Sequence, residues 1–130
     1  NQKIAEAYEA REYSKAMREI MILADKANQY IDHHKPWVVA KQKNNSNELQ
    51  GICTTGINLF RLLMLYLKPV LPIVAEKTER FLNIKPLQWQ DAQTTLLNHK
   101  INKFETLMTR VEKEKIDAMI ENSKDNFTKT

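Results

Sequence analysis

Apolar side chains recur at helical spacing through the first part of the chain. From about Ile4 to His34 they lie three or four residues apart, and neither glycine nor proline interrupts them. This pattern predicts one long helix that packs against other helices. The helix should end near His34, because Pro36 disfavours α-helical geometry at Lys35. The apolar stripe consists of Tyr8, Tyr13, Ala16, Met17, Ile20, Leu23, Ala24, Ala27 and Ile31.

Two helices are expected next. Proline is well tolerated in the first turn of a helix, so a short helix is predicted over about Pro36–Lys41. After a polar loop, Asn47 and Gln50 resemble a capping box that would start a helix from about Glu48 to Leu67. A glycine in a helix interior costs roughly 1 kcal/mol relative to alanine. We therefore expect Gly56 to mark a close approach between two helices.

The pattern weakens towards the C-terminus. A further helix is predicted with Pro72 in its first turn. Residues 83–102 lose clean periodicity and are expected to form an ordered but irregular excursion. Two more helical turns are predicted, one at Phe104–Val111 and one at Ile116–Ile120.

Composition supports the same architecture. Of 130 residues, 42% are hydrophobic and 28% charged, and only 2 Gly and 4 Pro leave little material for the turns of a β fold. We expect an all-α helical bundle in a single domain over residues 1–130, with the bundle over about 1–100 and a C-terminal helical segment over about 101–130. Because the chain begins at Asn1 within a helical pattern, we expect a domain excised from a longer protein.

Charge and cysteine content narrow the function classes. A net charge of +4 permits an anionic partner without requiring one. Cys53 is the single cysteine, so no internal disulfide can form and nothing indicates an oxidising compartment. No apolar run is long enough to span a bilayer, and the N-terminus does not resemble a signal peptide. We therefore expect a cytoplasmic protein.

Neither a metal site nor a catalytic site is predicted. His33 and His34 are adjacent, so on a helix they point about 100° apart and cannot share one ion. Only His99 and Cys53 remain as further nitrogen or sulfur ligands for a zinc ion. The chain contains no glycine-rich phosphate loop, no GxSxG and no HExxH, so we expect no catalytic residue in it.

Trp37 leaves two interpretations open. A lone tryptophan in a helical protein is usually buried, and this one could close the bundle. Its position favours another use, because Pro36 fixes it at a corner between two helices, with Lys35 beside it and Lys41 nearby. An exposed indole in such a place suits stacking on a nucleic-acid base, while the two lysines could contact phosphates. Trp89 lacks this setting and is expected to be packed.

Three stretches together resemble a known family. They are YEAREYSKAMREIMILADKANQYIDHHKPWVVAK, INLFRLLMLYLKPVLPIVAEKTERFLN and LLNHKINKFETLMTRVEKEKIDAMIE. In this order and spacing they are similar to the C-terminal anticodon-binding domain of bacterial methionyl-tRNA synthetases, which are class I aminoacyl-tRNA synthetases. The likeness covers almost the whole chain.

The resemblance implies a function and a site. The family charges tRNA(Met) with methionine at the expense of ATP, and its helical domain reads the CAU anticodon. Its stacking tryptophan, preceded by proline, corresponds to Trp37 and Pro36. The family also uses an Asn and an Arg of an earlier helix to read the same base, and these correspond to positions before Asn1, so neither is assigned to a residue of this chain. The resemblance also implies an N-terminal catalytic domain as partner, with ATP, Mg and a structural Zn there and no cofactor in this segment.

Other functions stay open on the residues alone. The apolar face of the helix over Glu48–Leu67 could bind a partner protein, which would make the chain a helical interaction module. The proline–tryptophan corner and the LKPVLPIVAE segment also resemble the anticodon-binding domains of other class I synthetases.

Overall fold

The structure is a computed structural model that describes residues 2–127, and it describes the side chains of residues 2–123. No strand occurs within these residues, so the predicted all-α fold class is confirmed. None of the helices in the described part of the chain is both long and apolar enough to cross a membrane. In chain order the elements are α1 (Gln2–Glu9), α2 (Tyr13–His34), α3 (Pro36–Val39), α4 (Ser46–Leu67), α5 (Pro72–Leu82), a 3-10 helix η1 (Trp89–Gln93) and α6 (Lys113–Phe127).

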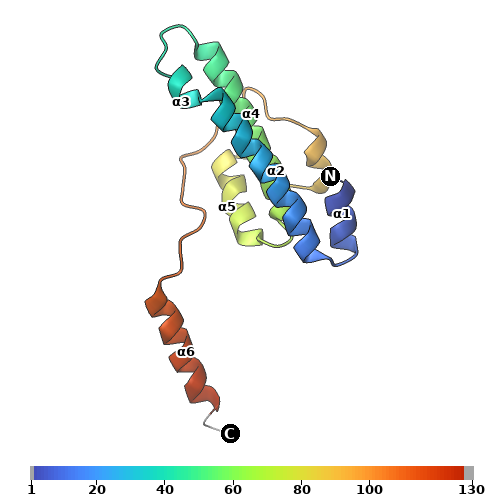
Figure 1. Ribbon diagram of the computed structural model, residues 1–130, viewed down its shortest axis with the longest axis vertical. Helices are drawn as coiled ribbons and strands as arrows, with labels where there is room; N and C mark the ends of the chain where they lie inside the picture. Colours follow the sequence, from blue (N-terminus) through green and yellow to red (C-terminus); the bar gives the residue numbers. More distant parts are fainter. Residues whose placement is uncertain (1, 128–130) are drawn as a thin grey trace.

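The single long helix predicted over Ile4–His34 is wrong, because the chain reverses between α1 and α2. Arg11 takes the left-handed conformation with φ 58°, and α1 folds back along the lower part of α2 (Figure 1). The reversal buries Ile4 at 1% exposure in the core. Burying a side chain of this size is worth about 1.5–3 kcal/mol, which offsets the roughly 1–2 kcal/mol cost of a left-handed residue.

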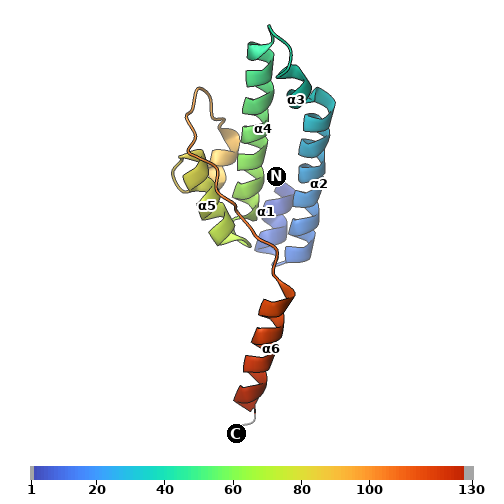
Figure 2. The ribbon, with the colours of Figure 1, turned by 90° about the vertical axis from the view of Figure 1, so that its left-hand side faces the viewer.

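Helices α2 and α4 form the body of the molecule and lie side by side (Figures 1 and 2). The expected close approach at Gly56 is confirmed, since a Cβ atom there would lie 3.2 Å from Cδ1 of Ile31. Helix α5 packs on the other side of α4 (Figure 2). The buried core consists of Ile4, Ile20, Leu65, Tyr66, Leu67 and Leu87.

The helix predicted over Glu48–Leu67 starts earlier than expected. Helix α4 begins at Ser46, and Asn47 does not act as the cap. Asn45 occupies the N-cap position, but its side chain makes no hydrogen bond to the helix. Its Nδ2 atom donates to Oε1 of Gln42 at 2.5 Å. A real capping box occurs elsewhere, where Gln88 and Asp91 cap η1 reciprocally.

Polar side chains, of which Arg61 and Glu79 are buried, hold the irregular segment after α5 against the bundle. The Arg61 guanidinium, which is 4% exposed, donates to the carbonyl oxygens of Asp91 and Thr94. Lys68 Nζ donates to Glu79 Oε1 at 2.6 Å, and the same oxygen accepts the backbone N–H of Leu87 at 3.1 Å. The expectation of an ordered excursion without helical periodicity is therefore confirmed.

The helical turn predicted at Phe104–Val111 does not form. These residues have no regular secondary structure, while the turn predicted at Ile116–Ile120 lies inside α6. The threonines Thr106 and Thr109 are poor helix formers, and Phe104 packs edge-on against Phe81 instead, with ring centroids 5.4 Å apart. Helix α6 extends away from the rest of the molecule (Figure 2).

Candidate functional site

The corner between α2 and α3 is built on a left-handed residue. Lys35 has φ 47° and ψ 62°, and its N–H donates to the Ile31 carbonyl oxygen at 2.9 Å, which closes α2. Its own carbonyl oxygen accepts the N–H groups of Val38 at 2.9 Å and Val39 at 3.2 Å, which opens α3. Pro36 was expected to exclude right-handed α geometry from Lys35, and this is confirmed. One residue therefore ends one helix and starts the next.

Trp37 is held at this corner with its side chain exposed. Pro36 occupies the first turn of α3, where its missing N–H costs no hydrogen bond. Val39 is buried at 9% exposure and anchors the short helix, whereas Trp37 is 51% exposed. Trp37 is thus not a core tryptophan. Within the described residues its ring stacks on no other ring and its indole N–H has no hydrogen-bond partner.

Two exposed lysines lie close to this tryptophan in the chain, one on each side of it. Lys35 and Lys41 are both exposed, and neither forms an ion pair with any other residue that the structure describes. The N–H of Lys41 donates to the Val38 carbonyl oxygen at 3.1 Å, which places this lysine just past the last turn of α3. The four residues predicted for the site, Lys35, Pro36, Trp37 and Lys41, therefore share one corner of the fold.

The two histidines next to this corner belong to the end of α2. The His34 ring lies against the Tyr30 ring with centroids 4.1 Å apart, and His34 Nδ1 donates to the Tyr30 carbonyl oxygen at 2.9 Å. Within the part of the chain that the structure describes, no group of three or more potential metal ligands is close enough to hold an ion. His99 lies elsewhere and donates through Nε2 to the Leu82 carbonyl oxygen at 2.7 Å.

Two supports of the site were missed in the sequence. The first is Val39, which is buried and anchors α3. A helix of only 4 residues is too short for its apolar periodicity to show which residue is buried. The left-handed conformation of Lys35 is the second, because a residue before proline is expected to be extended. An exposed aromatic ring beside unpaired cations can stack on an unpaired base and contact its phosphates.

Comparison with known families agrees with this chemistry. The family described as the anticodon-binding domain of methionyl tRNA ligase matches residues 1–127. The match covers α1 to α6 and includes the corner that carries Trp37. The chain therefore belongs to the family of anticodon-binding domains of methionyl tRNA ligases, and its function is tRNA anticodon recognition.

Proposed function

We propose that Trp37 stacks its indole on the cytosine that begins the CAU anticodon of tRNA(Met). The observation that carries this proposal is the exposure of Trp37, 51%, at a corner fixed by backbone hydrogen bonds. Because the backbone of this corner is already fixed, base stacking has only the Trp37 side chain to order. Stacking of one base on an aromatic side chain is worth roughly 1–3 kcal/mol.

The neighbours of Trp37 have separate roles in this proposal. Pro36 restricts the backbone of the corner and so limits where the indole can point. Lys35 and Lys41 contact the phosphates on either side of the stacked base. Because every base has a π-face, stacking alone discriminates poorly between bases. Selection of cytosine therefore needs hydrogen-bonding groups in addition to Trp37.

The wider assignment follows from the family. We propose that this domain acts within a methionine–tRNA ligase, an ATP-dependent enzyme of the cytoplasm whose catalytic domain belongs to the same protein. That catalytic domain would hold ATP, Mg and a structural Zn, and this segment would supply the anticodon contacts. The family match to a methionyl tRNA ligase domain supports this assignment.

Fluorescence of a single tryptophan tests the stacking. In the Trp89→Phe variant, Trp37 is the only indole, and a CAU anticodon stem-loop should quench it, because a stacked base quenches indole emission. In the matched Trp37→Phe variant, where only Trp89 emits, the same stem-loop should leave the emission unchanged. Quenching of Trp89 alone would show that RNA binds at another surface.

A further inference from the structure

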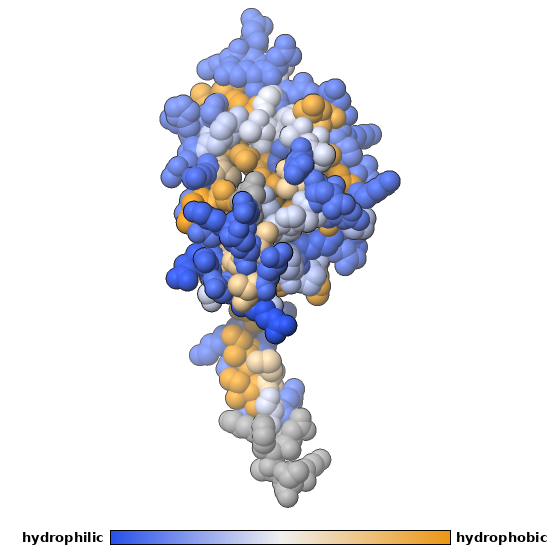
Figure 3. Space-filling model, turned by 90° about the vertical axis from the view of Figure 1, so that its right-hand side faces the viewer, coloured by the Kyte–Doolittle hydropathy of each residue, from blue (hydrophilic) through white to orange (hydrophobic). Residues whose placement is uncertain are grey.

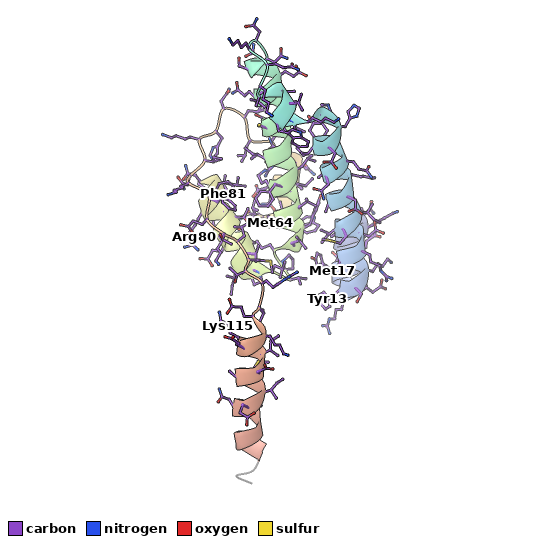
Figure 4. The ribbon with its side chains drawn as sticks, turned by 60° about the vertical axis from the view of Figure 1, so that its left-hand side comes forward. Tyr13, Met17, Met64, Arg80, Phe81 and Lys115 are labelled. Carbon is purple, nitrogen blue, oxygen red and sulfur yellow. The ribbon has the colours of Figure 1, made fainter. Side chains whose placement is uncertain are left out.

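A second group of aromatic residues surrounds a recess on another part of the molecule. Tyr8, Tyr13 and Trp89 come from α1, α2 and η1 and line a cavity of about 450 Å³. This aromatic recess is completed by Ala5, Glu9 and Pro69. Tyr13 stands at the α1–α2 end of the bundle (Figure 4), whereas Trp37 follows the other end of α2. Because α2 has 22 residues, the two sites lie roughly 30 Å apart.

The rings of Tyr8, Tyr13 and Trp89 are steeply inclined to one another, so they line the sides of the recess and do not stack in parallel. The Tyr8 and Tyr13 ring centroids are 6.3 Å apart with planes at 56°, and those of Tyr8 and Trp89 are 6.4 Å apart at 83°. The Tyr8 hydroxyl donates to the Tyr66 carbonyl oxygen at 2.6 Å, and the Trp89 ring lies 5.2 Å from the Tyr66 ring. Two of the three walls are thus fixed to the core before any ligand arrives.

The recess has a carboxylate and no cation of its own. Glu9 lines it and pairs with no basic group among the described residues. Its neighbour Glu12 differs, since Lys15 Nζ lies 3.2 Å from its carboxylate. The Tyr8 phenol is uncharged at neutral pH, and burial raises its pKa further above that range. The electronegative faces of aromatic rings and a free carboxylate are complementary to an organic cation.

We propose that the aromatic recess binds the guanidinium group of an arginine side chain presented by a partner protein. A planar guanidinium can lie on one aromatic face while its N–H groups donate to the Glu9 carboxylate, which a compact ammonium group does less well. A phosphate group is disfavoured, because Glu9 would repel it. Apolar patches interrupt the polar surface on the α1 side of the molecule (Figure 3).

The experiment titrates the 130-residue chain with N-acetyl-arginine amide and follows the Trp89 indole signal by NMR. N-acetyl-citrulline amide is the matched control ligand, because it has nearly the same shape without the charge. We expect a saturable shift of Trp89 with the arginine compound and at least about tenfold weaker binding of the citrulline compound. The Trp37 indole should not shift with either.

Three variants assign the effect to the recess. Tyr13→Leu and Glu9→Gln should each weaken binding of the arginine compound several-fold, whereas Glu12→Gln should leave it unchanged. Tyr13 is 54% exposed, so its replacement removes a wall without opening the core. Equal binding of both compounds, or a preference for cytidine over both, would overturn the proposal. Neither result depends on Trp37, so the proposed anticodon contact stands or falls separately.

Discussion

At the scale of single residues, the site depends on one unusual backbone conformation. Lys35 adopts left-handed geometry, which is unfavourable for any residue with a Cβ atom. A lysine occupies this position, although glycine would adopt the left-handed conformation at a lower steric cost. The structure thus keeps a positive charge next to Trp37 at a cost in stability. The identity of Pro36 and Trp37 could be read from the sequence, but this conformation could not, because the rule for residues before proline predicts an extended backbone.

Substitutions at Lys35 separate its charge from its conformation. Lys35→Gly and Lys35→Ala both remove the charge, so both should weaken binding of a CAU stem-loop and reduce its salt dependence. Only glycine relieves the left-handed strain, so Lys35→Gly should be more stable to urea unfolding than Lys35→Ala by about 1 kcal/mol. Equal stability of the two variants would contradict the strain, and unchanged RNA affinity would contradict the phosphate contact.

At the scale of elements, periodicity predicted most helices and failed where tertiary burial decides. The apolar spacing continues from α1 into α2, so nothing in the pattern signals the reversal at Arg11. Helix α5 and the irregular excursion were predictable because Pro72 and the loss of periodicity mark them in the sequence. What holds the excursion could not be predicted, since it depends on long-range hydrogen bonds from Asn58 and Arg61.

Asn58 provides a test of how the excursion is held. Its Nδ2 atom donates to the Leu96 carbonyl oxygen at 2.9 Å, and its Oδ1 atom accepts the Leu96 N–H at 2.7 Å. Asn58→Ala leaves both groups of Leu96 unpaired and should destabilise the fold by about 1–3 kcal/mol. Hydrogen exchange of the Leu96 amide should accelerate at the same time. The exposed Asn47→Ala is the control; slow Leu96 exchange in Asn58→Ala would show that other contacts hold the segment.

At the scale of the whole molecule, the chain divides into a packed helical body and a projecting α6 (Figure 2). The apolar residues of α6 face solvent, with Ile116 at 41%, Met119 at 63% and Ile120 at 46% exposure. The apolar stripe of α6 could be read from the sequence, but its lack of contact with the helical body could not. Periodicity identifies an amphipathic face without identifying the surface that covers it. The bundle around Tyr66 and Ile20 therefore owes little of its stability to α6.

Removal of α6 tests this division. A chain that ends at Glu112 should unfold in urea with a midpoint close to that of the full chain, because the deleted side chains contribute no buried core residue among those described. Its m-value should fall only slightly, since little surface is buried by α6. A loss of more than about 2 kcal/mol would show that α6 packs on the body in solution.

The central claim, that Trp37 stacks on the first base of the anticodon, is tested most directly by a thermodynamic cycle. The affinities of the unmodified chain and of Trp37→Ala are measured for a CAU stem-loop and for one that lacks the first anticodon base. If the indole stacks on that base, Trp37→Ala should weaken binding of the CAU loop by about 5- to 150-fold and leave binding of the abasic loop nearly unchanged. An equal loss for both loops would place Trp37 against another part of the RNA, and no loss for either would remove it from the site.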